Sequence, residues 1–224
     1  MSGNKKISFK QKEELDVIRR EAFRTLKTSV QFCGEDVKVI ALTSCIPEEG
    51  TADVTVHLAE ALAEDGNRVL CVDGNLRNAE LTGLFDAKKE EAGLSEFLMG
   101  KAELDKIVNE TETAGLDLVL AGERSSNPSG MLNGKRYVEF INGVRQKYDY
   151  VLISTPAAGA VSDCMIAARQ TDGVVMVVGN KQVSYKFAQK VKQQLERSNV
   201  PILGAVLNKV PLGKKIRSAA EAQQ

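Results

Sequence analysis

The 224-residue chain carries 30 basic and 30 acidic side chains, and 43% of its residues are hydrophobic. A chain of this length and composition can bury an ordinary core, as one substantial domain or as two small ones. Because the charges cancel, composition gives no electrostatic reason to expect binding to nucleic acid or to anionic lipid.

The sequence shows no sign of a membrane span or of export. No stretch approaches the roughly 18 consecutive apolar residues that cross a bilayer, and the polar N-terminus lacks the apolar centre of a signal peptide. The cysteines are widely spaced and form no CxxC pair, which favours buried thiols over a metal site or disulfides. They are Cys33, Cys45, Cys71 and Cys164. We expect a protein of the reducing cytoplasm without a metal centre.

Short β-rich runs alternate with longer amphipathic segments along the chain. A long helix is predicted over about 9–32. Strands are predicted at 37–42, 68–72, 116–120, 150–153, 173–178 and 202–207. Several of these runs are almost continuously apolar, which is typical of parallel strands covered on both faces. The alternation predicts right-handed βαβ crossovers and an α/β fold with a doubly wound, mostly parallel sheet and helices on both faces.

No linker, repeat or low-complexity block marks a second domain. We therefore predict one domain over 1–224, in which the helix precedes an α/β core over about 37–210. A polar tail over 211–224 completes the chain. The basic run at 214–217 favours a solvated tail over a binding patch.

The loop after the first predicted strand, 43–53, lies where open parallel sheets bind ligands. A phosphate-binding loop would read GxxxxGK[ST] there: its amides surround phosphate, the lysine neutralises charge and the hydroxyl holds Mg²⁺. Here Gly50 is followed by Thr51 and Ala52. Taken alone, the loop indicates an ordinary turn from strand to helix.

Several motifs, in order, resemble those of the bacterial tyrosine kinases of capsule and exopolysaccharide biosynthesis. The loop at 43–53 is similar to TSSxPGEGKST, 68–77 to KVLLIDADLR and 148–156 to YDYVIIDTPP. Residues 21–27 are also similar to EAYRTLR, and residues 204–208 to GVVLN. The resemblance extends from about Glu21 to Val210. It implies a P-loop ATPase of the deviant Walker class, related to the partition ATPases.

The differences from the family pattern fall at positions that carry charge in phosphoryl transfer. Relative to the pattern, Glu48 replaces glycine, Thr51 lysine, Ala52 the magnesium-binding serine, Asp53 threonine, Asn75 the second aspartate and Ser154 the Walker B aspartate. Phosphoryl transfer depends on positioning and on cationic and metal stabilisation. We therefore predict an inactive catalytic site that retains no metal ligand set.

Other positions of the family site are retained. The resemblance assigns a degenerate nucleotide pocket to Gly50, Thr51, Ala52, Asp73, Arg77 and Asn208. Asn208 matches an adenine contact of related P-loop proteins, although an asparagine that caps a loop is an equal alternative. Asp73 could equally be a structural carboxylate at the end of its strand. We expect no cofactor, and ATP or ADP with Mg²⁺ only if this pocket still binds.

Glu21, Arg24 and Lys27 resemble the family's ExxRxxR element, which links neighbouring subunits into a ring. A solvated helical face is the alternative. The resemblance implies a homo-oligomer, but the tyrosine-rich tail that the family phosphorylates between subunits has no tyrosine here. Two further residues are interpreted as structural: Asp163 as an acidic residue at a helix N-terminus, and His57 as packing at the solvent edge.

Three functions remain open. The first is a catalytically degenerate, kinase-like regulatory or scaffold protein that docks on a membrane polysaccharide co-polymerase or adaptor, or on an active kinase paralogue. The second is an active ATP-dependent tyrosine kinase with unusual ligands. The third is a partition or septum-positioning ATPase, which the missing KGGxGK loop disfavours. The resemblance implies a cytoplasmic protein, held at the inner face of the membrane through its adaptor, and no nucleic-acid partner.

Overall fold

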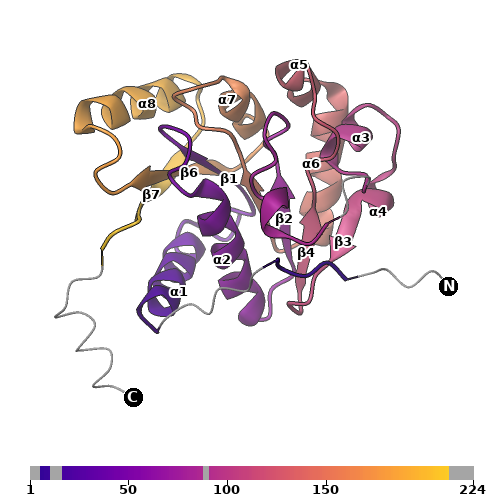
Figure 1. Cartoon of the computed structure of the whole chain (residues 1–224), viewed down its shortest axis with the longest axis horizontal. Helices are drawn as coiled ribbons and strands as arrows, with labels where there is room; N and C mark the ends of the chain where they lie inside the picture. The colour runs from indigo at the N-terminus through magenta and orange to yellow at the C-terminus, as the bar shows by residue number, and fades with distance from the viewer. Residues whose placement is uncertain (1–5, 11–16, 88–90, 212–224) are drawn as a thin grey trace.

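The computed structural model describes residues 6–10, 17–87 and 91–211. Their centre is a seven-stranded sheet in the order β3-β4-β2-β5-β1-β6-β7, with helices on both faces (Figure 1). All neighbouring strands are parallel except β3, which runs antiparallel to β4. The strands are β1 Val39–Ser44, β2 Val69–Asp73, β3 Val108–Glu110, β4 Leu116–Val119, β5 Tyr150–Ser154, β6 Gly173–Gly179 and β7 Ile202–Asn208.

The helices fall into two layers. They are α1 Val17–Gln31, α2 Thr51–Glu64, η1 Thr82–Leu84, α3 Leu94–Leu98, α4 Leu104–Ile107, α5 Pro128–Leu132, α6 Lys135–Lys147, α7 Asp163–Ala168 and α8 Tyr185–Arg197. Helix α2 packs on one face of the sheet, with α1 outside it. Helices α3, α6, α7 and α8 cover the other face.

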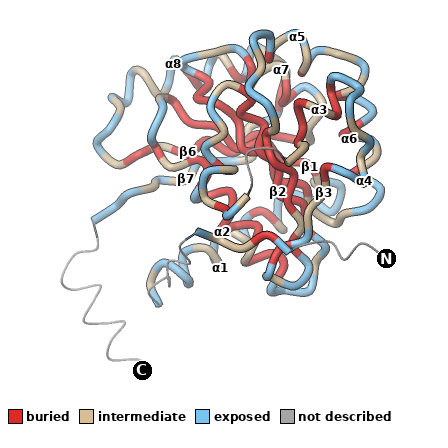
Figure 2. The backbone as a smooth tube through the Cα atoms, turned by 45° about the vertical axis from the view of Figure 1, so that its right-hand side comes forward, coloured by how far each residue is buried: buried red, intermediate tan, exposed pale blue. Residues whose placement is uncertain are grey.

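The apolar strands account for this layering, because successive side chains of a strand point to opposite faces. In β1, Ile40 and Leu42 join the core under α2, whereas Val39 and Ala41 join the cores under the other layer. All six residues of β1 are buried. The buried segments therefore gather at the centre of the molecule, and exposed ones surround them (Figure 2).

The predicted fold class is confirmed, and each predicted strand corresponds to an observed one within two residues at either end. Sequence patterning did not reveal β3. Its three residues, Val108–Glu110, are only partly buried and form no apolar run. Their pairing with β4 is a tertiary contact that a short polar segment does not signal.

The predicted start of the first helix was wrong. Phe9 lies in an extended segment that bridges Phe85, and the two ring centroids are 4.5 Å apart. Ile7 bridges Thr111 and is buried. The alternation of Ile7 and Phe9 has the period of a strand, which explains why this segment pairs instead of coiling. Helix α1 is described only from Val17.

No described helix is both long and apolar enough to cross a bilayer. The predicted polar tail lies outside the described residues from 212 onward.

The buried hydroxyl of Tyr137 generates a test of the core. Tyr137 is fully buried, and its oxygen has no hydrogen-bond partner among the described residues. Replacing an unpaired buried polar group with an apolar one is close to neutral. We expect Tyr137→Phe to leave the free energy of unfolding unchanged, or to raise it by up to about 1 kcal/mol, as measured by urea denaturation.

Tyr148→Phe is the matched control. The Tyr148 hydroxyl donates to Asp117 Oδ2 at 2.6 Å, so its loss should lower the free energy of unfolding by about 1–3 kcal/mol. Equal destabilisation by the two substitutions would contradict the assignment of an unpaired hydroxyl.

Candidate functional site

The candidate site lies at the carboxyl ends of β1, β2 and β5 and at the N-terminus of α2. The strand register pairs Ser154 with Asp73 on one side and with Leu42 on the other. Thr51 begins α2 directly after the loop that leaves β1. The fold thus places the loop at 43–53, the end of β2 and the end of β5 on the same edge of the sheet.

A buried carboxylate organises the loop between β1 and α2. Glu49 is fully buried, and its Oε2 accepts hydrogen bonds from the amides of Cys45 at 2.7 Å and Ile46 at 2.9 Å. Its Oε1 accepts from the amide of Gly179, at the end of β6, at 2.8 Å. A buried charge needs such hydrogen bonds to offset its desolvation. No sequence pattern indicates this role of Glu49, because its amide partner at Gly179 is 130 positions away.

The loop also contains two residues in the left-handed region. Glu48 has φ of 66° and Gly50 has φ of 86°. Glycine adopts such angles without steric cost, whereas other residues are strained there. At Gly50 a Cβ atom would also lie 2.4 Å from Asn208 Nδ2. Gly50 is therefore required by the loop, and Glu48 holds a conformation better suited to the family's glycine.

The end of β7 tethers the same loop. Asn208 Nδ2 donates to the carbonyl oxygen of Glu49 at 2.9 Å, and the Lys209 ammonium donates to that of Glu48. In the present structure Asn208 is therefore an anchor for the loop. Its contact with adenine stays a prediction.

The electrostatics of the loop differ from those of a phosphate site. Thr51 and Ala52 are buried at the start of α2, while Glu48 and Asp53 expose their carboxylates beside it. The helix N-terminus carries a partial positive charge that favours anions. Lys209 supplies one cation to the loop. The partial charge of the helix N-terminus and the charge of Lys209 are opposed by the carboxylates of Glu48 and Asp53, near the position where phosphate would approach.

Asp73 serves the backbone of its own loop. It is fully buried and accepts hydrogen bonds from the amides of Asn75 at 3.1 Å and Thr82 at 2.7 Å. Burial raises the pKa of Asp73 to about 6, and the hydrogen bonds from Thr82 oppose that rise. Asn75 in turn accepts from the amide of Asn78 at 3.0 Å. The alternative of a structural carboxylate at the strand end agrees with these contacts.

Arg77 pairs with a residue that was interpreted only as a helix start. Its Nε lies 2.5 Å from Asp163 Oδ2, and its Nη2 lies 3.1 Å from Oδ1. The hydroxyl of Ser129 donates to Asp163 Oδ1 at 2.5 Å. Asp163 does begin α7, but it also joins the loop after β2 to α5 and α7. No local sequence pattern connects these three residues.

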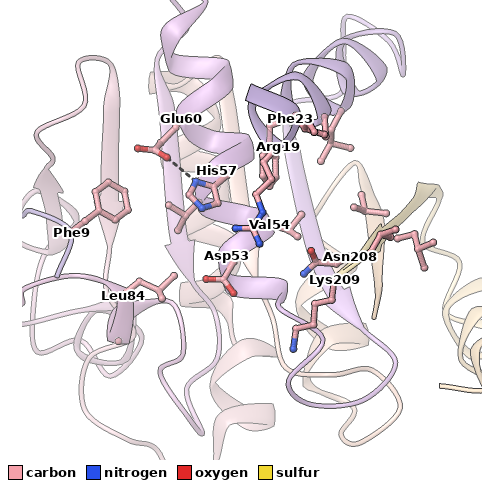
Figure 3. Close-up of a pocket in the computed structure, with 18 of the residues that line it drawn as sticks. Phe9, Arg19, Phe23, Asp53, Val54, His57, Glu60, Leu84, Asn208 and Lys209 are labelled. Atoms are coloured by element: carbon pink, nitrogen blue, oxygen red, sulfur yellow. Dashed lines mark hydrogen bonds and ion pairs between the residues drawn. The ribbon is translucent and has the colours of Figure 1, made fainter. Parts of the chain in front are cut away.

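A groove of about 820 Å³ continues from the loop along the outer face of α2 (Figure 3). Helix α1, Phe9 and Leu84 form its walls, and Asp53, Asn208 and Lys209 lie at the end beside the loop. Within the groove, His57 Nδ1 lies 3.0 Å from Glu60 Oε2. The imidazole also packs against the ring of Phe23, with centroids 5.1 Å apart. The contact with Phe23 joins α1 to α2.

The predicted interface residues lie on α1. Glu21 and Arg24 are exposed, and Arg24 Nη1 lies 3.6 Å from Glu21 Oε2. Lys27 instead contacts Asp65 at the end of α2 at 2.9 Å, and its side chain is only 16% exposed. Two of the three residues are thus available at the surface, and a subunit contact stays a prediction.

Among the described residues, no group of three or more His, Cys, Asp or Glu side chains is arranged to hold a metal ion.

The sequence was compared with known families and proteins. Residues 37–200 match a family model described as an AAA domain. The tyrosine-protein kinase CpsD of Streptococcus pneumoniae is 34% identical over 210 residues, covering 94% of this chain and 90% of the relative. The enzyme of that name from Streptococcus agalactiae is 34% identical over 190 residues, covering 85% and 83%.

Solved structures give the same result. The kinase domain of the Escherichia coli tyrosine kinase ETK superposes with a TM-score of 0.80 at 30% identity, covering 87% of this chain and 78% of that one. The cell-division ATPase MinD of Pyrococcus furiosus, at 26% identity, has a lower TM-score of 0.66, covering 83% and 78%. The sequence motifs, sheet topology and these relatives together establish that the chain belongs to the bacterial tyrosine kinase family of P-loop α/β proteins.

Proposed function

We propose that this chain is a catalytically inactive member of the family that acts as a regulatory or scaffold protein in capsular or exopolysaccharide biosynthesis. One observation carries the proposal: the loop keeps its framework, but the positions where the family has its phosphate-binding lysine and its metal-binding serine and aspartate hold other residues. Glu49, Gly50 and Asn208 maintain the loop. Thr51, Ala52 and Ser154 stand where the family has its lysine, serine and aspartate.

The size of the electrostatic change supports this proposal. At an effective dielectric constant near 20, two unit charges 4 Å apart interact by about 4 kcal/mol. Removing the lysine forfeits attraction of this order, and Glu48 and Asp53 add repulsion that solvent reduces. Losing one such stabilising group typically lowers a rate by about 10²- to 10³-fold. Because such losses are not additive, we infer negligible phosphotransfer without assigning a total. The residues present do not fit Mg²⁺–ATP.

An active kinase with unusual ligands is the second candidate. The observation in its favour is Lys209, whose ammonium reaches the loop at Glu48. A lysine at this point could replace part of the missing charge. It does not replace the metal ligands, because Ala52 and Asn75 offer no carboxylate or hydroxyl.

The proposed role needs partners. A scaffold of this family would dock on a membrane polysaccharide co-polymerase or adaptor at the cytoplasmic side of the membrane, and it would regulate an active kinase paralogue or assemble with copies of itself. The support is membership in a family whose named relatives are tyrosine-protein kinases.

The first test is direct. Purified protein incubated with Mg²⁺ and ATP should hydrolyse no more ATP than a buffer control and should gain no phosphotyrosine. We expect this because the residues at positions 51, 52 and 154 are uncharged, whereas the family has a lysine, a serine and an aspartate there. Phosphotyrosine found on the chain by mass spectrometry after this incubation would establish the second candidate instead.

The second test rebuilds the site. The quadruple variant Glu48→Gly, Thr51→Lys, Ala52→Ser and Ser154→Asp restores the glycine, the phosphate cation and two metal-binding groups. We expect it to bind Mg²⁺–ATP with micromolar affinity, about −8 kcal/mol, and the parent to show no calorimetric heat. Asn75→Asp should then be required in addition for phosphotransfer, because binding and activation use different groups.

Glu48→Gly alone is the matched control for that variant. It relieves the left-handed strain at φ of 66° without supplying a phosphate or metal ligand, so it should raise the melting temperature and bind no nucleotide. A folded quadruple variant that gives no heat with Mg²⁺–ATP would show that more than these substitutions separates the chain from active relatives.

The third test concerns assembly. If Glu21 and Arg24 contact a neighbouring subunit, the protein should self-associate and dissociate as salt screens the contact. Glu21→Ala with Arg24→Ala should lower the mass measured by light scattering at low salt. The exposed pair Lys101 and Glu123, 3.7 Å apart, provides the control double variant. A monomer at high concentration and low salt would exclude this interface.

A further inference from the structure

Helix α8 has a markedly asymmetric distribution of charge. Val191 and Leu195 are buried against the sheet. The exposed face carries Lys186, Lys190, Lys192 and Arg197. Its one acidic residue, Glu196, pairs with Lys192. At about 100° per residue, Lys186, Lys190 and Arg197 lie within about 40° of one another around the helix axis. They form a line of positive charge about 16 Å long.

Two neighbouring cations extend this line. Lys181 is exposed in the turn before α8, and Arg169 is exposed just after α7. Arg169 and Arg197 line a common hollow of about 390 Å³. The hydroxyls that also line it, of Thr171 and Ser198, donate to backbone carbonyls. None of Arg169, Lys181, Lys186, Lys190 and Arg197 has an ion-pair partner among the described residues.

We propose that these five residues, the α8 basic face, dock on a bilayer surface that contains anionic phospholipid. The charges are complementary, and their linear spread matches a plane of headgroups better than a single compact anion. Tyr185, at the start of α8, is 80% exposed but lies about 100° from Lys186 around the helix axis, so it is not part of this face. The rest of the exposed face is polar, so the helix would lie at headgroup level.

The zero net charge of the chain does not oppose this docking. At physiological salt the Debye length is about 8 Å, so a bilayer responds to the nearest charges rather than to the sum over the molecule. Glu48 lies in the loop before α2 and Asp53 in the first turn of that helix, and among the described residues no ion pair joins either of them to the five cations. The proposal extends the proposed function, because the contact would orient the chain at the membrane, and it is independent of nucleotide binding.

The experiment is co-sedimentation of the purified full chain with vesicles, in the absence of any other protein. An equal mixture of phosphatidylcholine and phosphatidylglycerol should bind the chain at low salt, and phosphatidylcholine alone should not. Salt of about 1 M, where the Debye length is about 3 Å, should release it. Neutralising Lys186→Gln with Lys190→Gln should lower the partition coefficient roughly 25-fold, or about fivefold for each charge.

Lys101→Gln with Lys106→Gln is the matched control. It makes the same change in net charge at exposed lysines beside α3 and α4, which lie on the far side of the molecule from α8 (Figure 1). This variant should bind the mixed vesicles like the parent. All four substitutions are at exposed positions, so circular dichroism and the melting temperature should be unchanged.

Three results would overturn the proposal: no binding to the mixed vesicles at low salt, equal binding to vesicles without anionic lipid, or equal weakening by the two double variants. The first result would assign the α8 basic face to an acidic protein surface. Failure here leaves the proposed loss of catalysis untouched, because no step of the vesicle experiment involves nucleotide.

Discussion

The burial of the Glu49 carboxylate is the interaction on which the candidate site depends. A charge with no exposure to solvent persists because three backbone amides surround it, two from its own loop and one from the end of β6. Asn208 and Lys209 then hold the carbonyl groups of the same loop from the end of β7. The shape of the loop is thereby maintained by the protein itself and needs neither phosphate nor the motif's lysine.

This arrangement explains how the loop keeps its shape although residues at the phosphate- and metal-binding positions of the family are replaced. The groups that position the loop are a buried carboxylate, a glycine in the left-handed region and the side chains of Asn208, which ends β7, and of Lys209, which follows it. The groups that would handle phosphate and metal occupy other positions, 51, 52, 75 and 154, where substitution leaves the positioning contacts intact. Asp73 also has a positioning role, because both of its carboxylate oxygens accept hydrogen bonds from backbone amides.

The surface has a similar separation of roles. Negative charge at the loop, from Glu48 and Asp53, disfavours phosphate, whereas positive charge gathers along α8. Because the chain has 30 basic and 30 acidic residues, its net charge of zero gives no sign of either charged region. Local fields decide which partner approaches a given face, since screening limits the reach of each charge to about a Debye length.

The sequence by itself determined the fold class, six of the seven strands and the family. Continuous apolar runs such as those of β1 and β6 indicate directly that both faces of the strand are buried. The order of the motifs along the chain identifies the family. The substituted positions in the loop could also be read without coordinates, because a motif assigns each position its chemical type. For the same reason, the loss of the lysine at Thr51 and of the aspartate at Ser154 was visible at once.

Only the tertiary structure decided which side chains act together. The contact between Arg77 and Asp163 spans 86 positions, and that between Glu49 and Gly179 spans 130. Hydrogen bonds of this kind depend on the packing of elements that no local period encodes. The short strand β3 and the convergence of Arg169 with Arg197 have the same origin. Each arises from surfaces that meet only after the sheet has assembled.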